Sequence, residues 1–175
     1  IPNHGVVNMH GAYLPYNRGG NPNVWPLIDG TPAGVSLHYM TPELDRGPII
    51  DRREVEKQPS DTAKSLLDRI RREAIQQFKQ LWPAIRDGTV ETTPQPKDAG
   101  SYHSWSDFVD LWKLELDESA TYREVIDHLR ALSHPPHNNA YFEVDGECYF
   151  VELSITPVTE TEEDVGEYGG RSADN

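Results

Sequence analysis

The chain of 175 residues contains a single cysteine, Cys148. One cysteine cannot form a disulfide within the chain, and it cannot supply the group of thiolates that structural zinc sites use. A reduced, cytoplasmic setting is therefore the expected compartment.

Long apolar runs are also lacking. No stretch approaches the roughly 18 apolar residues that mark a transmembrane helix, and no basic segment followed by an apolar one resembles a secretory leader. We therefore expect neither a membrane span nor a leader. Hydrophobic residues make up 36% of the chain, which is enough for the core of one domain, or of one domain with a small appendage.

Basic residues are scarce. The chain has 16 Lys and Arg against 29 Asp and Glu, a formal net charge of −13. Since non-specific affinity for nucleic acids comes from Lys and Arg side chains that neutralise phosphates, this balance disfavours a nucleic-acid partner. Part of the imbalance lies in residues 157–175, which we expect to form an acidic, solvated and mobile tail.

The seven histidines do not form a persuasive metal motif. His134 and His137 have a spacing that would put both on one helical face, but Pro135 and Pro136 between them exclude a helix. Because no third ligand has a suitable spacing, we expect no metal site. A zinc hydrolase is accordingly the least favoured function.

Asn8 and His10 follow an apolar segment that has the character of a strand. Side chains alternate along a strand, so these two point to the same face. Gly11 and Pro15 then turn the chain into a loop, the kind of junction where catalytic groups concentrate. Alone, an Asn-x-His pair is more often structural than catalytic, and Asp45 alone would be an ordinary turn residue.

Four motifs follow one another within residues 1–55: Val7-Asn8-Met9-His10-Gly11-Ala12-Tyr13-Leu14-Pro15, Arg18-Gly19-Gly20, Gly34-Val35-Ser36-Leu37-His38-Tyr39-Met40 and Glu43-Leu44-Asp45-Arg46-Gly47-Pro48-Ile49-Ile50. In order and spacing they resemble the catalytic core of the folate-dependent formyltransferases. That family includes glycinamide ribonucleotide formyltransferase, methionyl-tRNA formyltransferase and the sugar N-formyltransferases. Ala12 is a departure, because many members have serine there; the departure affects a substrate contact and not the catalytic residues.

The resemblance implies a catalytic triad of Asn8, His10 and Asp45. In formyl transfer an amine attacks the formyl carbon of 10-formyltetrahydrofolate, which creates an oxyanion and a cationic nitrogen. Asn8 would donate to the oxyanion, a contact whose loss typically costs about 3 kcal/mol. His10 would accept the amine proton, since imidazole titrates near neutral pH. Asp45 would orient His10, stabilise its charge or relay protons through water.

Binding residues are expected on both sides of the triad. The residues expected to contact folate are Leu44, Asp45 and Gly47. The residues expected to contact the acceptor, a nucleotide-linked amino sugar, are Arg18, Gly19, Asn139 and Tyr141. We expect His38 to be structural or a neighbour of the folate.

Periodicity predicts an α/β fold. Strand patterns occur in residues 5–9, 33–40 and 48–55. Residues 21–29 predict a short helix that begins near Pro22 and ends before Gly30. A long helix follows, capped by Ser60 or Asp61 and ended by Asp87-Gly88. Its apolar stripe is expected to lie in the core: Leu66, Leu67, Ile70, Ala74, Phe78, Leu81 and Ile85.

The C-terminal third predicts a small α+β appendage. Trp105, Phe108, Leu111 and Trp112 predict an aromatic helical stretch that packs on the catalytic part. A further helix begins at Thr121, where Glu124 completes a capping box; its expected buried face is Tyr122, Val125, Ile126, Leu129 and Leu132. Asp145-Gly146 predicts a β-hairpin between residues 141–144 and 147–155.

These elements give four regions. Residues 1–90 form a partial catalytic domain, the C-terminal half of a Rossmann-like formyltransferase sheet. Residues 91–106 form a linker, residues 107–156 the appendage, and residues 157–175 the tail. Family members have further strands upstream, so the resemblance implies a piece of a longer polypeptide or a truncated product with an incomplete folate site. The hairpin is apolar on both faces, and the related sugar enzymes use this region to dimerise, so we expect a homodimer.

The passage from Arg130-Ala131-Leu132 to Asn139-Ala140-Tyr141-Phe142 resembles the sugar N-formyltransferases. That branch implies formyl transfer to the amine of a nucleotide-linked 4-amino-4,6-dideoxy sugar, for bacterial surface polysaccharide such as lipopolysaccharide O-antigen. Two alternatives stay open. One is methionyl-tRNA formyltransferase, which the acidic charge disfavours. The other is a non-catalytic remnant that keeps the triad but lacks a complete folate site.

Overall fold

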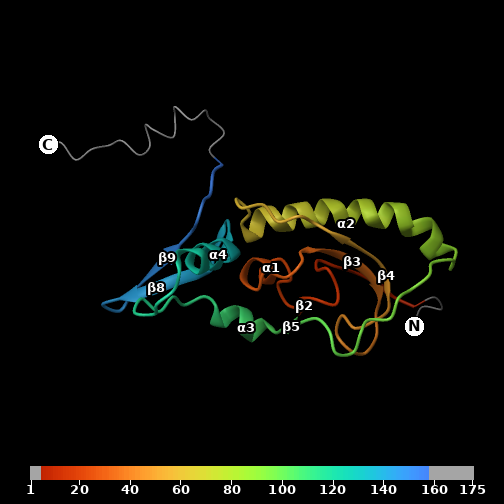
Figure 1. The fold of residues 1–175 in the computed structure, drawn as a ribbon, viewed down its shortest axis with the longest axis horizontal. Helices are drawn as coiled ribbons and strands as arrows, with labels where there is room; N and C mark the ends of the chain where they lie inside the picture. Colours follow the sequence, from red (N-terminus) through yellow and green to blue (C-terminus); the bar gives the residue numbers. More distant parts are fainter. Residues whose placement is uncertain (1–4, 158–175) are drawn as a thin grey trace.

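The N-terminal part of the chain is built on a three-stranded antiparallel sheet with a long helix packed against it (Figure 1). The structure, a computed structural model, describes residues 5–157, so nearly all of the expected acidic tail lies outside the described residues. Strand β3 (Gly34–Tyr39) lies between β1 (Val7–His10) and β4 (Ile49–Glu54). The expected α/β class is confirmed. Within the described residues β1 and β4 are the two edge strands of this sheet, and Met9 on β1 is 46% exposed.

Strand β3 is buried on both faces although its sequence alternates between apolar and polar residues. Val35 packs in the core with Leu66 and Ile70. Ser36 and His38 are also almost fully buried. They tolerate burial because both are hydrogen-bonded, Ser36 to the backbone of residues 12 and 14 and His38 to the carbonyl of Tyr39. The polar positions of β3 therefore face the loops above the sheet and not the solvent.

Helix α2 (Ala63–Arg86) begins at a different cap from the one predicted. The N-cap is Thr62, whose hydroxyl accepts from the Ser65 N–H while the Ser65 hydroxyl accepts from the Thr62 N–H. This reciprocal pair is a capping box with serine in the third position. Asp61, one of the predicted caps, instead accepts from the Gln58 N–H and pairs with Arg69. The predicted end is confirmed, with Gly88 at a φ of 67°.

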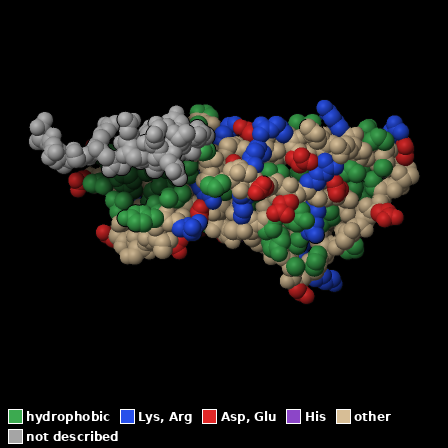
Figure 2. All heavy atoms as spheres, turned by 45° about the horizontal axis from the view of Figure 1, so that its top comes forward, with side chains coloured by type: hydrophobic (Ala, Val, Ile, Leu, Met, Phe, Trp, Pro, Cys, Tyr) green, Lys and Arg blue, Asp and Glu red, His purple; other side chains and the backbone are tan. Residues whose placement is uncertain are grey.

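The apolar stripe of α2 is buried along a slightly different line from the predicted one. Leu66, Ile70 and Ala74 are buried as expected, but the line continues through Gln77, which is fully buried and donates to the Asp51 carboxylate. Phe78 is rotated away from that line and is 38% exposed, so the prediction of a core position was wrong. Figure 2 shows apolar side chains lying among charged ones over this surface. No described helix has the length and apolarity that a membrane span needs.

Helix α1 (Trp25–Ile28) is shorter than predicted and begins at Trp25, not near Pro22. Pro26 is tolerated because it lies in the first turn, where its missing N–H would have no helical acceptor. Trp25 and Leu27 are buried in the core.

The appendage contains α3 (Trp105–Asp110), α4 (Tyr122–Leu132) and a hairpin of β8 (Ala140–Val144) and β9 (Glu147–Val151). The predicted capping box of Thr121 and Glu124 is confirmed. The predicted turn is also confirmed, with φ of 52° at Asp145 and 82° at Gly146. Strand β9 ends at Val151 and not at residue 155, because Val151 pairs with Ala140, the first residue of β8. Beyond it, the Leu153 N–H donates to the Ser133 hydroxyl.

Helix α4 buries only the C-terminal end of the face that its pattern predicted, where Leu132 is in the core and Leu129 packs against it. Tyr122 is 90% exposed, and Val125 and Ile126 are 43% and 46% exposed. Only the last turn, at Ala131 and Leu132, is buried, because the helix packs on α1 and α2 through that end. The first turns of α4 therefore present an apolar face that the described residues do not cover.

Two short strand pairs complete the fold. Strand β6 (Ser133–His134) pairs with β7 (His137–Asn138) inside the appendage. Strand β2 (Arg18–Gly19) pairs in parallel with β5 (Tyr102–His103), which lies inside the predicted linker. This second pair joins the loop after β1 to a segment more than 80 residues further along the chain.

Thr62→Ala should lower the free energy of unfolding by about 1 kcal/mol, because the substitution removes the hydroxyl that satisfies an N–H in the first turn of α2. Thr62→Ser keeps the hydroxyl and should stay close to the parent chain. Urea unfolding followed by circular dichroism measures both. An equal loss in the two variants would show that the hydroxyl does not stabilise α2.

Candidate active site

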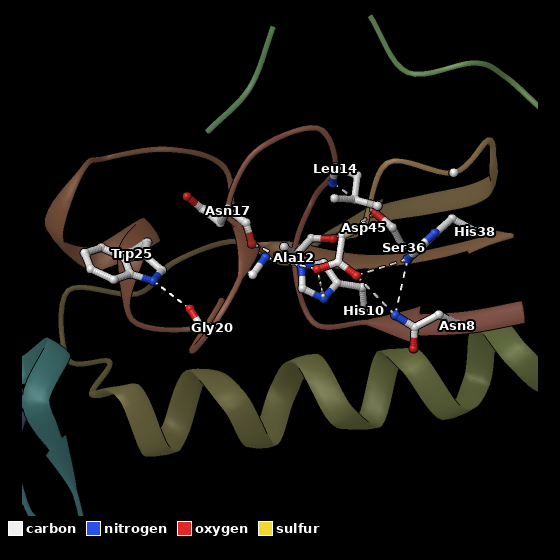
Figure 3. Close-up of polar contacts among 12 residues, drawn as sticks. Asn8, His10, Ala12, Leu14, Asn17, Gly20, Trp25, Ser36, His38 and Asp45 are labelled. Carbon is white, nitrogen blue, oxygen red and sulfur yellow. Dashed lines mark hydrogen bonds and ion pairs between the residues drawn. The ribbon is translucent and has the colours of Figure 1, made fainter. Parts of the chain in front are cut away.

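Asn8, His10 and Asp45 come together at the end of β1 (Figure 3). The antiparallel register places Asn8 opposite His38 and His10 opposite Ser36, and residues directly opposite each other share a face. Asp45 reaches the same face from the β3–β4 connection. Its carboxylate lies 3.3 Å from Asn8 Nδ2 and 3.7 Å from His10 Nδ1. The three residues predicted from the sequence are therefore clustered as expected.

Asp45 is held in place from several directions. Its backbone has a φ of 53°, a left-handed conformation that aspartate tolerates better than most residues. The Gly19 N–H donates to Oδ2 at 3.0 Å. The Gln95 amide donates to the carbonyls of Asp45 and Gly47 at 2.7 and 2.8 Å. The carboxylate therefore has little freedom to turn away from His10.

The hydrogen bonds of His10 identify its basic nitrogen. Its Nε2 lies 3.1 Å from the backbone carbonyl oxygen of Asn17. Since a carbonyl oxygen only accepts hydrogen bonds, Nε2 must carry the proton in the neutral ring. The lone pair is then on Nδ1, which faces the Asp45 carboxylate. A proton taken up by His10 would lie on the side of Asp45.

His38 and Asn8 form the other side of the cluster. His38 Nδ1 lies 2.9 Å from the Tyr39 carbonyl oxygen, so by the same reasoning its Nε2 is an acceptor. Asn8 Nδ2 is 3.3 Å from that Nε2 and 3.3 Å from Asp45 Oδ1. Both amide hydrogens of Asn8 are therefore engaged, and the amide is held with its nitrogen toward the carboxylate.

The charge states of the cluster follow from burial and neighbours. Burial lowers the pKa of His10 below its ordinary value, and the Asp45 carboxylate only partly opposes this shift. Burial acts to raise the pKa of Asp45, but the rings of His38 and His10 in their protonated forms, together with the Gly19 N–H, outweigh burial and lower it. Near neutral pH the site therefore holds a neutral imidazole beside a carboxylate.

Four further residues lie in the site beyond those predicted to be catalytic or to bind, and of these only His38 was expected near it, as a structural residue or a neighbour of the folate. His38 and Ser36 belong to the face of β3 that carries the triad contacts, while Gln95 and Ser101 reach it from the linker. His38 and Ser36 lie in the Gly34–Met40 motif of the family resemblance, but the polar alternation of this segment is equally typical of a solvent-facing strand. Recognising them required the register of β1 against β3, which the sequence does not give.

Besides Asp45, four of the expected binding residues belong to the two loops that meet at the Asp45 carboxylate. The Gly19 N–H donates to the carboxylate, and Leu44, one residue before Asp45, is 58% exposed. Gly47 lies so close to the Tyr39 carbonyl that an added Cβ would be 1.6 Å from its oxygen, so glycine is required there. Arg18 is buried, and its Nη1 has no hydrogen-bond partner among the described residues. Burial lowers the pKa of Arg18, as does the nearby Arg46, while Asp45 opposes the shift.

The other two expected binding residues lie in the appendage. Asn139 lines a cavity of about 310 Å³ between the catalytic part and the appendage, with walls that include Trp105, Phe108 and Trp112. Tyr141 pairs its backbone with Trp112 and Leu114. Among residues 5–157, no hydrogen bond or ion pair joins Asn139 or Tyr141 to the triad, and no three His, Cys, Asp or Glu side chains are arranged to hold a metal ion.

Comparison with known proteins finds relatives along most of the chain. dTDP-4-amino-4,6-dideoxyglucose formyltransferase from Mycobacterium tuberculosis is 36% identical over 152 residues, which are 86% of this chain and 64% of that protein. The chain therefore spans less than two thirds of the length of this curated relative.

Solved structures of formyltransferases share the fold of this chain. A 4-N formyltransferase from Francisella tularensis superposes with a TM-score of 0.83 at 32% identity, covering 87% of this chain and 63% of that one. A formyltransferase from Anoxybacillus kamchatkensis, solved with UDP-4,6-dideoxy-4-formamido-L-AltNAc and tetrahydrofolate, is 39% identical. Its TM-score is 0.58, over 60% of this chain and 55% of that one.

Two family regions are recognised in the chain. Residues 1–81, which contain the whole triad, match the formyl transferase family. Residues 107–157 match the N-formyltransferase dimerization C-terminal domain. With both regions in this order and the triad assembled, the chain belongs to the formyltransferase family.

Proposed function

We propose that this chain carries the catalytic centre of an enzyme that transfers a formyl group from 10-formyltetrahydrofolate to the amine of a nucleotide-linked 4-amino-4,6-dideoxy sugar. The observation that carries the proposal is the convergence of Asn8, His10 and Asp45 on one face of the sheet. The name of the Mycobacterium tuberculosis relative supports the class of acceptor. The product would enter bacterial surface polysaccharide.

His10 is the proton acceptor in this proposal. An amine that attacks a carbonyl carbon becomes cationic and must lose a proton. The lone pair on His10 Nδ1 receives that proton, and the resulting imidazolium is stabilised by the Asp45 carboxylate 3.7 Å away. The tetrahedral intermediate then collapses as the bond between the formyl carbon and N10 of the folate breaks, and the imidazolium gives its proton to N10, so that tetrahydrofolate leaves as a neutral amine. The lowered pKa of His10 keeps the ring neutral, and so able to accept a proton, at neutral pH.

Asn8 supplies the hydrogen-bond donor for the oxyanion. A donor fixed beside developing negative charge stabilises the transition state more than it stabilises the ground state. The two contacts of Asn8 Nδ2, both 3.3 Å, are at the long end of the range for hydrogen bonds. One amide hydrogen can therefore turn to a substrate oxygen at small cost while the other keeps the side chain in place.

Folate binds beside Asp45 in this proposal. 10-formyltetrahydrofolate supplies the formyl carbonyl. The exposed side chain of Leu44, one residue before Asp45, offers an apolar surface, which suits a flat heterocycle with polar edges. Leu44, Asp45 and Gly47 would hold it, and the close packing of Gly47 on Tyr39 gives the loop its shape.

The acceptor binds on the side of Arg18 and Gly19. The buried Nη1 of Arg18, which has no hydrogen-bond partner within residues 5–157, is suited to a phosphate group, and a nucleotide-linked sugar brings two phosphates. Asn139 and the aromatic walls of the neighbouring cavity would receive the nucleotide, since aromatic side chains stack on bases. Tyr141 would support that wall through its backbone pairing with Trp112.

The active form is a homodimer assembled through the appendage. The apolar side chains of α4 and of the hairpin are exposed, Phe150 by 63%, and Figure 2 shows apolar side chains gathered over this end of the molecule. An exposed apolar patch of this kind marks an interaction surface. The match of residues 107–157 to a dimerization domain supports a second copy of the chain as the partner.

The chain should transfer a formyl group from 10-formyltetrahydrofolate to at least one member of a panel of dTDP- and GDP-linked 4-amino sugars, detected by mass spectrometry as a formylated product. His10→Gln should lower turnover by about 10²–10⁴-fold, because the proton acceptor is lost. Methionyl-tRNA is included as a competing acceptor.

His128→Gln is the matched control for that experiment. The His128 Nε2 also contacts a backbone carbonyl, that of Leu111 at 2.8 Å, but it lies in the appendage. Its turnover should stay close to the parent value. Formylation of methionyl-tRNA alone, or no transfer by a correctly folded chain, would refute the proposed function.

Asp45→Asn should shift the acidic limb of the pH profile of kcat/KM to lower pH and should also reduce kcat. The carboxylate raises the pKa of His10, so its removal lets that pKa fall further, and the ring stays neutral at a more acid pH. Asparagine tolerates the left-handed backbone at position 45, so the loop should be preserved. A limb that moves to higher pH would contradict the proposed pairing.

Phe150→Glu should convert the dimer to a monomer of 19.8 kDa at micromolar concentration, because a buried carboxylate without a partner opposes association. Trp82→Glu is the control, since Trp82 is 47% exposed on α2 and outside the appendage; this variant should remain dimeric. Light scattering distinguishes the two states, and a monomeric parent chain would contradict the proposed assembly.

A further inference from the structure

The linker, residues 91–106, lies against both loops that carry triad contacts. Thr93 pairs with Ile49 through two hydrogen bonds of 2.8 Å, at the start of β4. The chain then passes the Asp45 turn, and β5 pairs with β2. The segment therefore touches first the loop after β3 and then the loop after β1.

Gln95 is the first linker residue whose side chain contacts the site. Its amide nitrogen donates to the carbonyl of Asp45 at 2.7 Å and to the carbonyl of Gly47 at 2.8 Å. These two carbonyls lie on either side of Arg46 and close the turn in which Asp45 has its positive φ. A single side chain thus fixes the backbone conformation that directs the carboxylate toward His10.

Ser101 is the second linker residue whose side chain contacts the site. Its hydroxyl accepts from the Asn17 N–H at 2.9 Å and donates to Asn17 Oδ1 at 3.0 Å. Asn17 is fully buried and has a φ of 57°, so its backbone is held in an uncommon conformation. The Asn17 carbonyl is the group that accepts from His10 Nε2. Ser101 therefore acts on His10 through one intermediate residue.

Backbone hydrogen bonds also join the segment around Ser101 to the loop after β1. The Arg18 N–H donates to the Ser101 carbonyl at 3.1 Å, and the Gly20 N–H donates to the His103 carbonyl at 2.9 Å. Between them, the Gly19 N–H remains directed at the Asp45 carboxylate. Gly100 allows the two segments to approach, because a Cβ there would lie 2.0 Å from the Pro15 carbonyl oxygen.

We propose that the linker is a positioning element of the active site, in which Ser101 and Gln95 hold the backbones of Asn17 and Asp45 so that His10 presents Nδ1 to the carboxylate. A linker that only connected two regions would not need side-chain contacts that end on these two residues. The catalytic consequence rests on the proposed function. The tautomer of His10 does not, because it is a property of the chain without substrate.

The first test is nitrogen NMR of the full chain, with the His10 signal assigned by its loss in His10→Gln. The parent chain should show the neutral ring protonated on Nε2. Ser101→Ala should populate the tautomer protonated on Nδ1, because the Asn17 carbonyl is no longer fixed. Ser101→Thr keeps the hydroxyl and should restore the parent spectrum, and Ser106→Ala, which removes an exposed hydroxyl from α3, should leave the His10 signal unchanged.

The second test is kinetic and uses Gln95→Met, which keeps the shape of the side chain but removes its donors. Misplacement of a catalytic group by about 1 Å can cost up to 10²-fold in rate, so kcat should fall by about tenfold or more for Ser101→Ala and Gln95→Met. KM for the sugar should stay within about twofold of the parent value, because neither Ser101 nor Gln95 is proposed to contact the nucleotide-linked sugar.

The outcomes separate the two claims. If the His10 tautomer and kcat are both unchanged in Ser101→Ala and Gln95→Met, the linker does not position the site. If the unsubstituted chain transfers no formyl group, the proposed function fails while the tautomer measurement still decides the role of Ser101. If Ser101→Ala does not fold, Gln95→Met decides by its kcat and by the His10 signal.

Discussion

The structure depends on one contact, that between the carboxylate of Asp45 and Nδ1 of His10 across 3.7 Å. Both groups are buried, so neither charge is fully screened by water and each controls the protonation of the other. Burial favours the neutral imidazole at neutral pH, the form that the proposed function needs in a proton acceptor, and the carboxylate would stabilise the proton once it has been taken up. Without the Asp45 carboxylate, the protonated ring of His10 would be a buried cation without a partner of opposite charge.

Three separate parts of the chain are needed to maintain that contact. The register of β1 against β3 puts Asn8 and His10 on one face with His38. The loop after β1 supplies the Asn17 carbonyl and the Gly19 N–H, which fix the ring and the carboxylate. The linker holds both loops through Gln95 and Ser101. Helix α2 contributes no group to the site but supports the sheet from the opposite face through Leu66 and Ile70.

Local signals in the sequence predicted the elements, while long-range contacts decided their boundaries and exposure. The capping box at Thr121 and the Asp145-Gly146 turn depend on neighbouring residues and were predicted correctly. Burial of Phe78 and of the first turns of α4 was predicted wrongly, because the burial of an apolar stripe depends on what packs against it. The triad could be placed by its resemblance to a family, and His38 lies in one of the motifs that carry the resemblance. Gln95 and Ser101 reach the site from a distant segment, and their contacts there depend on the tertiary structure.

The most direct test of the central claim is a crystal structure of the chain with a stable 10-formylfolate analogue. The account predicts that the formyl oxygen lies within about 3 Å of Asn8 Nδ2, with the formyl carbon open to the side of His10 Nδ1 and the ring system over Leu44. A complex in which the formyl group faces away from Asn8 and His10, or in which the analogue binds outside the loop of Asp45, would contradict it.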